Sequence, residues 1–369
     1  MNIGLLKEVK SFEHRIMLVP EAVQDLVEKG NSVYIESGAG QGSGYDDKAY
    51  ESAGAYVLPT SEKVFKKVEL ILKIQPPMPI EYELYTAKHI GFSLHLPINI
   101  TDRLQYLIKS NAIYLCGDLI HAISDNMNEI AGKVAVIQAQ KYLERDFGGK
   151  GILFSGSCGL SGARVTIIGS STSGLATANQ ALLYGASVNL VCDNYQKLVT
   201  FKSNQNSDAL EIFEFDRGIL RNLLIETDVL IISGQNPDEK LNIQISNDDL
   251  KILESGSLII DLSVNHGNII KSSRETKPNE PIYLQNGLLY FSITNLTSFV
   301  PRTSSTILSK SALKYVNLLA KMGFQEAIAT SPDLRGSLVL YKGKIISSLL
   351  LENGKSEHYD ILELLELNI

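Results

Sequence analysis

Short apolar runs rich in β-branched residues alternate with amphipathic stretches along most of the chain. The first apolar runs predict strands near residues 2–6, 32–35, 70–74, 90–94 and 112–115. The segment from Pro20 to Gly30 is predicted to form a helix, with the proline at its first position and the glycine just past its end. Strands that alternate with helices are typical of a parallel sheet covered by helices on its faces.

A long helical pattern from about 125 to 146 separates two such alternations. It ends at Gly148-Gly149, and we interpret it as the helix that joins two domains. The second alternation has predicted strands at 164–168, 187–192, 229–232 and 258–261, and a helix over 304–322. We expect the remaining tail to pack on the first domain. The predicted architecture is two doubly wound α/β domains with a cleft between them, formed by residues 1–128 plus 301–369 and by residues 129–300.

The composition suits two folded domains and excludes several classes of function. Of the 369 residues, 44% are hydrophobic, and 34 basic residues face 41 acidic ones, for a formal net charge of −7. This balance argues against disorder and against a basic surface made for nucleic acid. No apolar run is long enough to span a bilayer, and the first residues lack the apolar core of a signal peptide. The cysteines Cys116, Cys158 and Cys192 show no metal-ligand spacing, so we expect buried free thiols in a cytoplasmic protein without a metal site.

A glycine-rich turn lies between a predicted strand and a predicted helix, at residues 168–174. Gly169 allows a tight turn and Gly174 allows the helix to approach the strand, as in a dinucleotide-binding turn. Ser171 stands where that motif has its middle glycine, beside the pyrophosphate. Asp193 ends the next strand, where a carboxylate binds the ribose 2′-hydroxyl and favours NAD over NADP. The alternative is an ordinary α/β turn followed by an aspartate at a strand end.

Three further polar residues follow predicted strands. Arg15 comes shortly after the first strand, and its guanidinium fork suits a substrate carboxylate. His95 ends an apolar strand and His266 follows another, and an imidazole is the usual general acid/base near pH 7. Taken singly, each of these side chains is also compatible with an ordinary structural or solvated role.

With these residues in place, the chain resembles alanine dehydrogenase and the related alpha subunit of nicotinamide nucleotide transhydrogenase over nearly its full length. The resemblance implies two Rossmann-type domains, with the N-terminal part and the tail binding substrate and residues 129–300 binding NAD. The segments that carry the resemblance are short but keep their order: Lys7-Glu8 to Arg15 and Pro20, 36–44, 53–55, Leu72-Lys73, Leu94-His95-Leu96, 128–132, 149–151, the turn from Gly169 to Gly174, Asp193, and Asn295 to 300–304.

The resemblance also assigns roles to single residues. It implies that Arg15, Gln75 and Asn295 bind a small carboxylate substrate, and that His95 and Asn265 occupy the catalytic positions. A homo-oligomer, either dimer or hexamer, is the expected assembly. The residues expected to contact NAD are Gly169, Ser171, Gly174, Asp193, Lys197 and Asn128.

Several of these positions depart from the family pattern. Gln75 stands where the family has a substrate-binding lysine, and Asn265 where it has an aspartate beside the nicotinamide. A charged hydrogen bond contributes about 1.5–3 kcal/mol against about 0.5–1.5 kcal/mol for a neutral one, and asparagine cannot exchange a proton near neutral pH. Ser93 replaces an aromatic residue, Asn128 a serine, and the polar loop 233–238 a hydrophobic one. L-alanine therefore cannot be assumed as the substrate.

Three functions are compatible with this sequence. The first is an NAD-dependent oxidoreductase acting on a small amino acid or 2-oxo or imino acid with changed specificity. The second is a pseudoenzyme of the same fold that binds NAD or a metabolite. The third is a transhydrogenase-type NADH-binding subunit, against which His95 argues, because that branch generally lacks this histidine.

Overall fold

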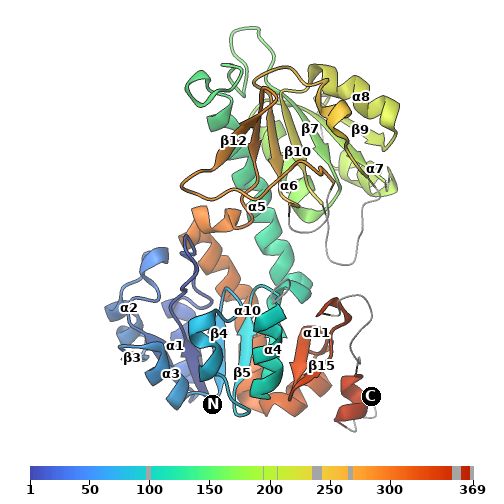
Figure 1. Cartoon of the computed structure of the whole chain (residues 1–369). Helices are drawn as coiled ribbons and strands as arrows, with labels where there is room; N and C mark the ends of the chain where they lie inside the picture. Colours follow the sequence, from blue (N-terminus) through green and yellow to red (C-terminus); the bar gives the residue numbers. More distant parts are fainter. Residues whose placement is uncertain are drawn as a thin grey trace. The chain divides into compact units, whose positions relative to one another are not determined.

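The computed structural model describes residues 1–96, 101–193, 195–205, 207–234, 243–264, 269–350 and 359–365. These residues form two compact domains (Figure 1). The first domain comprises Met1–Met127 and Ser298–Ile369, and the second comprises Asn128–Thr297. These boundaries lie one and three residues before the expected ones.

The first domain contains an eight-stranded sheet in the order β15-β14-β6-β5-β4-β1-β2-β3. Strands β1 to β6 are parallel, and the tail adds β14 and β15 as an antiparallel edge. The strand order reverses between β1 and β4, as in a doubly wound fold. The strands are β1 (Asn2–Leu5), β2 (Ser32–Glu36), β3 (Tyr56–Leu58), β4 (Leu70–Lys73), β5 (Ile90–Ser93), β6 (Ile113–Cys116), β14 (Leu338–Tyr341) and β15 (Lys344–Ile345).

Burial explains why the sequences of the central strands are continuous apolar runs. Every residue of β4, β5 and β6 is buried, because helices cover both faces of a parallel sheet. The α-helices of this domain are α1 (Pro20–Glu28), α2 (Asp47–Ser52), α3 (Ser61–Lys67), α4 (Thr101–Ser110), α10 (Pro301–Thr330), α11 (Pro332–Gly336) and α12 (Ile361–Leu364). Short 3₁₀ turns are η1 (Gln41–Ser43), η2 (Pro79–Leu84), η3 (Gly117–Leu119), η5 (Leu296–Phe299), whose first two residues belong to the second domain, and η6 (Ser348–Leu350).

The second domain repeats the same plan in the order β12-β13-β11-β10-β7-β8-β9. Its strand order reverses between β7 and β10, and only β12 runs antiparallel to its neighbour. The strands are β7 (Arg164–Ile168), β8 (Ser187–Cys192), β9 (Leu210–Glu214), β10 (Val229–Ile232), β11 (Leu258–Asp261), β12 (Ile282–Gln285) and β13 (Leu288–Phe291). The α-helices are α6 (Thr172–Leu183), α7 (Tyr195–Ser203), α8 (Arg217–Glu226) and α9 (Asn247–Leu250).

The long helix α5 (His121–Tyr142) crosses the domain boundary, and a 3₁₀ turn, η4 (Arg145–Phe147), follows it. The helix therefore begins four residues earlier than predicted. The expectation of two doubly wound Rossmann-type α/β domains is confirmed for each domain taken by itself.

Two expectations need correction. Cys158 is exposed rather than buried, whereas Cys116 and Cys192 are buried as expected. The alternation also gave no signal for β9 or for the hairpin β12–β13, which turns at Asn286 and Gly287, both with positive φ.

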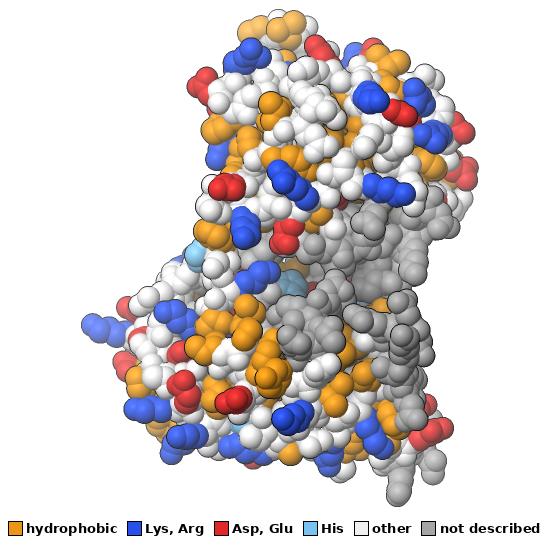
Figure 2. Space-filling view, in the orientation of Figure 1, with side chains coloured by type: hydrophobic (Ala, Val, Ile, Leu, Met, Phe, Trp, Pro, Cys, Tyr) orange, Lys and Arg blue, Asp and Glu red, His pale blue; other side chains and the backbone are white. Residues whose placement is uncertain are grey.

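Two surface properties agree with the composition. Among the described residues, no helix is long and apolar enough to cross a membrane. On the face shown in Figure 2, basic and acidic side chains are interspersed in both domains.

Candidate active site

Four neighbouring strands of the first sheet bring their polar ends together. Glu13 and Arg15 follow β1, Gln75 follows β4, His95 follows β5 and Asp118 follows β6. The carboxyl ends of parallel strands share one edge, and ligands bind there where the strand order reverses. The residues after β1 and β4 stand at that reversal.

A buried ion pair forms the centre of this group. Nε and Nη2 of Arg15 donate to the two carboxylate oxygens of Glu13, each at 2.8 Å, and both side chains are 0% exposed. The backbone N–H of Arg15 and Nε2 of Gln75 also donate to Glu13, at 3.1 and 2.8 Å. Four donors therefore fill the four lone-pair positions of one carboxylate.

The surroundings of Glu13 set its acidity. Burial by itself raises the pKa of this carboxyl, but the Arg15 charge and the hydrogen bonds from Arg15 and Gln75 outweigh it and lower the pKa to about 2. Glu13 is therefore ionised at every physiological pH and matches the permanent charge of Arg15.

The ion pair continues into a histidine–carboxylate pair. Nη2 of Arg15 lies 3.0 Å from Nε2 of His95, and Nδ1 of His95 lies 3.0 Å from Oδ2 of Asp118. An arginine N–H can only donate, so Nε2 of His95 must accept, and Nδ1 must carry the proton that reaches Asp118. His95 is therefore neutral in this arrangement, with one tautomer selected. Its side chain is 32% exposed and that of Asp118 is 33% exposed, so this end of the network is open to solvent.

A second buried carboxyl holds the loop that carries Gln75. Glu8 accepts hydrogen bonds from the backbone N–H groups of Ile74, at 2.6 Å, and Gln75, at 3.3 Å. Lys73 forms an ion pair with Glu81 and lies 3.8 Å from Glu8. Burial raises the pKa of Glu8 to about 7, against the opposing charge of Lys73.

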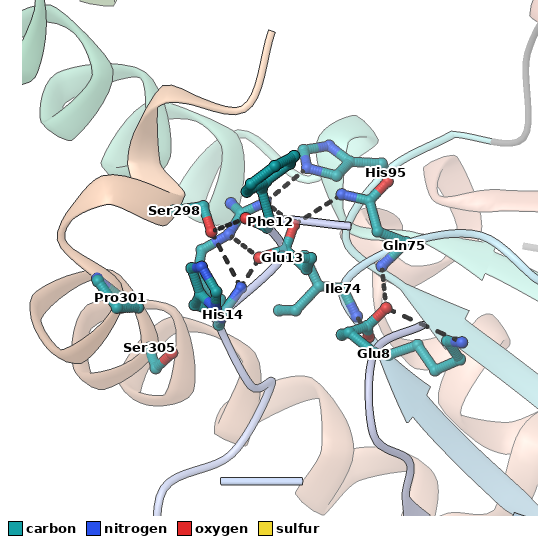
Figure 3. Close-up of polar contacts among 12 residues, drawn as sticks. Glu8, Phe12, Glu13, His14, Ile74, Gln75, His95, Ser298, Pro301 and Ser305 are labelled. Carbon is teal, nitrogen blue, oxygen red and sulfur yellow. Dashed lines mark hydrogen bonds and ion pairs between the residues drawn. The ribbon is translucent and has the colours of Figure 1, made fainter. Parts of the chain in front are cut away.

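Serine hydroxyls from η5 and α10 fix the loop that carries Arg15. Ser298 accepts from the His14 N–H at 3.0 Å and donates to the Phe12 carbonyl at 2.7 Å (Figure 3). Ser305 accepts from the Ile16 N–H at 2.9 Å, and Ser309 accepts from Val19 N–H at 3.1 Å. The φ angle of Phe12 is +64°, which is unfavourable for a residue other than glycine. Such a conformation persists only where the surrounding structure holds it in place.

The expected cofactor turn lies in the second domain. Gly169 has φ +108°, and a Cβ on Gly174 would lie 2.5 Å from the Gly169 carbonyl oxygen, so both positions require glycine. Ser171 caps α6, and its φ of −65° suits any residue. Asp193 is exposed directly after β8. These features fit the diphosphate and ribose of a dinucleotide.

The remaining expected site residues lie elsewhere along the chain. Asn128 is half-buried in α5, Lys197 is half-buried in α7, and Asn295 is half-buried after β13. Asn265, His266 and residues 235–238 lie outside the described residues. Ser93 donates to the His95 carbonyl at 2.7 Å, which ties down the histidine that follows it.

The comparisons with known proteins decide the family. Residues 4–136 match "Alanine dehydrogenase/PNT, N-terminal domain", and residues 135–348 match "Alanine dehydrogenase/PNT, C-terminal domain". The chain belongs to the alanine dehydrogenase/PNT family. It is 30% identical over 353 residues to an alanine dehydrogenase of Staphylococcus haemolyticus, with 94% of each chain covered. It is 29% identical to alanine dehydrogenase 2 of Staphylococcus aureus over the full length of both.

The solved structures agree. An L-alanine dehydrogenase superposes with a TM-score of 0.89 at 27% identity, covering 95% of this chain and 98% of that one. A transhydrogenase from Sinorhizobium meliloti superposes with a TM-score of 0.77 at 18% identity, covering 94% and 99%, and shows the shared fold alone.

We predict that Glu13→Gln destabilises the chain by about 3 kcal/mol at pH 7, because it removes the carboxylate that forms a buried ion pair with Arg15. A carboxyl whose pKa falls to about 2 on folding contributes stability above its ordinary pKa of 4.5 and loses it as the pH falls toward 2. The difference between variant and wild type should therefore shrink at pH 3. Urea unfolding at both pH values measures it, with the exposed Glu21→Gln as control. An equal difference at both pH values would contradict the ion-pair account.

Proposed function

We propose that this chain is an NAD-dependent oxidoreductase that acts on a small amino acid and the corresponding 2-oxo or imino acid, with a specificity different from that of alanine dehydrogenase. The observation that carries the proposal is the continuous hydrogen-bonded row Asp118–His95–Arg15–Glu13–Gln75 at the strand reversal of the first sheet. It combines a proton-transfer group with a carboxylate-binding group, in a family whose named relatives are alanine dehydrogenases.

His95 is the proposed acid/base. The Asp118 carboxylate holds the ring through Nδ1 and leaves Nε2 to exchange a proton with the substrate. Nε2 accepts a hydrogen bond from Arg15, and this bond must break before Nε2 can exchange a proton with the substrate. Arg15 and the substrate therefore compete for Nε2 of His95. A nicotinamide cofactor, when bound, would supply the hydride chemistry, while the protein supplies binding and orientation.

The proposed NAD contacts lie in the second domain. Gly169, Ser171 and Gly174 would hold the diphosphate at the N-terminus of α6, and Asp193 would hold the ribose. Lys197 and Asn128 complete the proposed set, and Asn295 and Asn265 are proposed near the reacting groups on the family pattern alone.

The charge of the substrate site supports a changed specificity. The Nε–Nη2 edge of Arg15 is taken by Glu13, and Gln75 adds no cation. With neutral His95, the row from Asp118 to Gln75 carries a net charge of −1, whereas a lysine at position 75 would bring it to zero and repel a substrate carboxylate less. The same observation favours the second candidate, a pseudoenzyme that binds nucleotide without turnover.

We also propose that the chain acts in the cytoplasm as a homo-oligomer. Large apolar side chains that remain exposed in the second domain offer contact surface: Leu153, Leu160 and Leu183 are 63%, 77% and 72% exposed.

NADH titration followed by a panel of small 2-oxo acids with ammonium tests the function. We expect NADH to bind and to be oxidised with at least one panel member. His95→Ala should then lower turnover by about 10²–10⁴-fold at unchanged NADH affinity, whereas His14→Ala, an exposed histidine on the Arg15 loop, should not. NADH binding without turnover on any acid would replace the oxidoreductase by the pseudoenzyme.

Gln75→Lys tests the proposed cause of the changed specificity. Restoring a cation beside Arg15 should raise kcat/KM for pyruvate by about tenfold, the difference between a charged and a neutral hydrogen bond. Gln75→Met, of similar length but uncharged, is the matched control. A lysine variant no faster than the methionine variant would show that charge at position 75 does not set the specificity.

A further inference from the structure

Three buried serine hydroxyls meet at the strand reversal of the second sheet. Ser171 and Ser173 follow β7, and Ser233 follows β10, the two strands between which the order reverses. The Ser171 and Ser233 hydroxyl oxygens lie 2.5 Å apart, and each lies 3.0 Å from the Ser173 hydroxyl. Their exposures are 8%, 7% and 0% for Ser171, Ser173 and Ser233. We call these three residues the serine ring.

The ring leaves no hydroxyl proton for an outside partner. Each serine has one proton, and in a three-membered ring each hydroxyl donates once and accepts once. The Ser171 oxygen accepts in addition from the Gly174 N–H, at 3.4 Å, as the cap of α6. The hydroxyl of Ser171 is therefore directed into the domain and committed there.

This direction matters because Ser171 replaces a glycine of the dinucleotide turn. Its φ of −65° and ψ of 166° show that the backbone itself needs no glycine at this position. The glycine of the motif instead leaves room for the pyrophosphate beside the backbone. In this structure the Ser171 hydroxyl points to Ser173 and Ser233, which keeps it out of that space.

The space for the ring is limited by the turn itself. A Cβ on Gly174 would lie 2.7 Å from the Ser233 hydroxyl oxygen and 2.5 Å from the Gly169 carbonyl oxygen. Ser233 is thus packed directly beneath the turn, and its own backbone N–H donates to the Ile168 carbonyl at 2.8 Å. The turn therefore limits the position of the Ser233 hydroxyl on one side, and the backbone hydrogen bond to Ile168 fixes the residue that carries it.

We propose that Ser173 and Ser233 are positioning residues for the dinucleotide diphosphate. They hold the Ser171 hydroxyl inside the domain, so that the first turn of α6 stays accessible to a phosphate group although the motif has lost its middle glycine. This inference rests on the proposed NAD binding and adds residues to it that lie outside the glycine motif.

A double-mutant cycle on NADH affinity tests the proposal. Ser233→Ala removes a ring partner and lets the Ser171 hydroxyl adopt other rotamers, so NADH binding measured by calorimetry should weaken by about fivefold, the equivalent of one neutral hydrogen bond. Ser171→Gly removes the side chain that the ring holds and is the reference for the double variant. The double variant Ser171→Gly, Ser233→Ala should match Ser171→Gly, because no side chain remains to be misplaced.

Two controls separate positioning from general damage. Ser257→Ala removes another buried serine hydroxyl of the same sheet, which donates to the Thr227 carbonyl at 3.2 Å, and should leave NADH affinity unchanged. ADP-ribose, which has the diphosphate but lacks nicotinamide, should show the same loss as NADH in Ser233→Ala. Urea unfolding of each variant without nucleotide reports whether the domain is folded, and Ser173→Ala serves as the second ring variant.

The possible results are distinguishable. Equal NADH affinity in wild type, Ser233→Ala and Ser173→Ala would overturn the positioning role and leave NAD binding intact. A double variant as weak as Ser233→Ala would also overturn it, because the loss would then not pass through Ser171. A wild-type chain that binds no NADH would refute the proposed function and this inference together.

Discussion

A guanidinium and a carboxylate that are both removed from water hold the first domain's site together. Each buried charge is tolerable only because the other is present and because hydrogen bonds satisfy the remaining positions, which Glu13 achieves with four donors. The loop that delivers Arg15 is in turn pinned by Ser298 and Ser305. Moving either charge would break this buried ion pair and the hydrogen bonds that Gln75 and His95 make to it.

The ion pair also determines which groups donate and which accept along the row of hydrogen bonds. Because arginine only donates, the hydrogen bond to His95 selects one tautomer and leaves Asp118 as the acceptor at the far end. At the near end Gln75 supplies a neutral donor where the family has a cation. Under the proposed function, this site would keep an acid/base pair and would hold a substrate carboxylate with less positive charge.

The alternation of apolar and amphipathic segments predicted the central parallel strands of both sheets, because buried parallel strands are apolar along their whole length. It missed β3, β9 and the strands from β12 to β15. The strand-end pattern also singled out Arg15 and His95, which the structure places in contact with each other. Their partners escaped prediction, since Glu13 and Asp118 look like ordinary surface acids until the sheet places them beside the arginine and the histidine. Ser233 was missed for the same reason: only the strand reversal brings its hydroxyl to Ser171.

The tautomer of His95 tests this account most directly. Long-range ¹H–¹⁵N correlation spectra of the histidine-labelled protein at pH 7.5, assigned with His95→Ala, report which ring nitrogen carries the proton. A protonated Nδ1 with a proton-free Nε2 is the predicted result, because Nε2 accepts from Arg15. A proton on Nε2, in either the neutral tautomer or the imidazolium form, would contradict the directed network from Asp118 through Arg15 to Glu13.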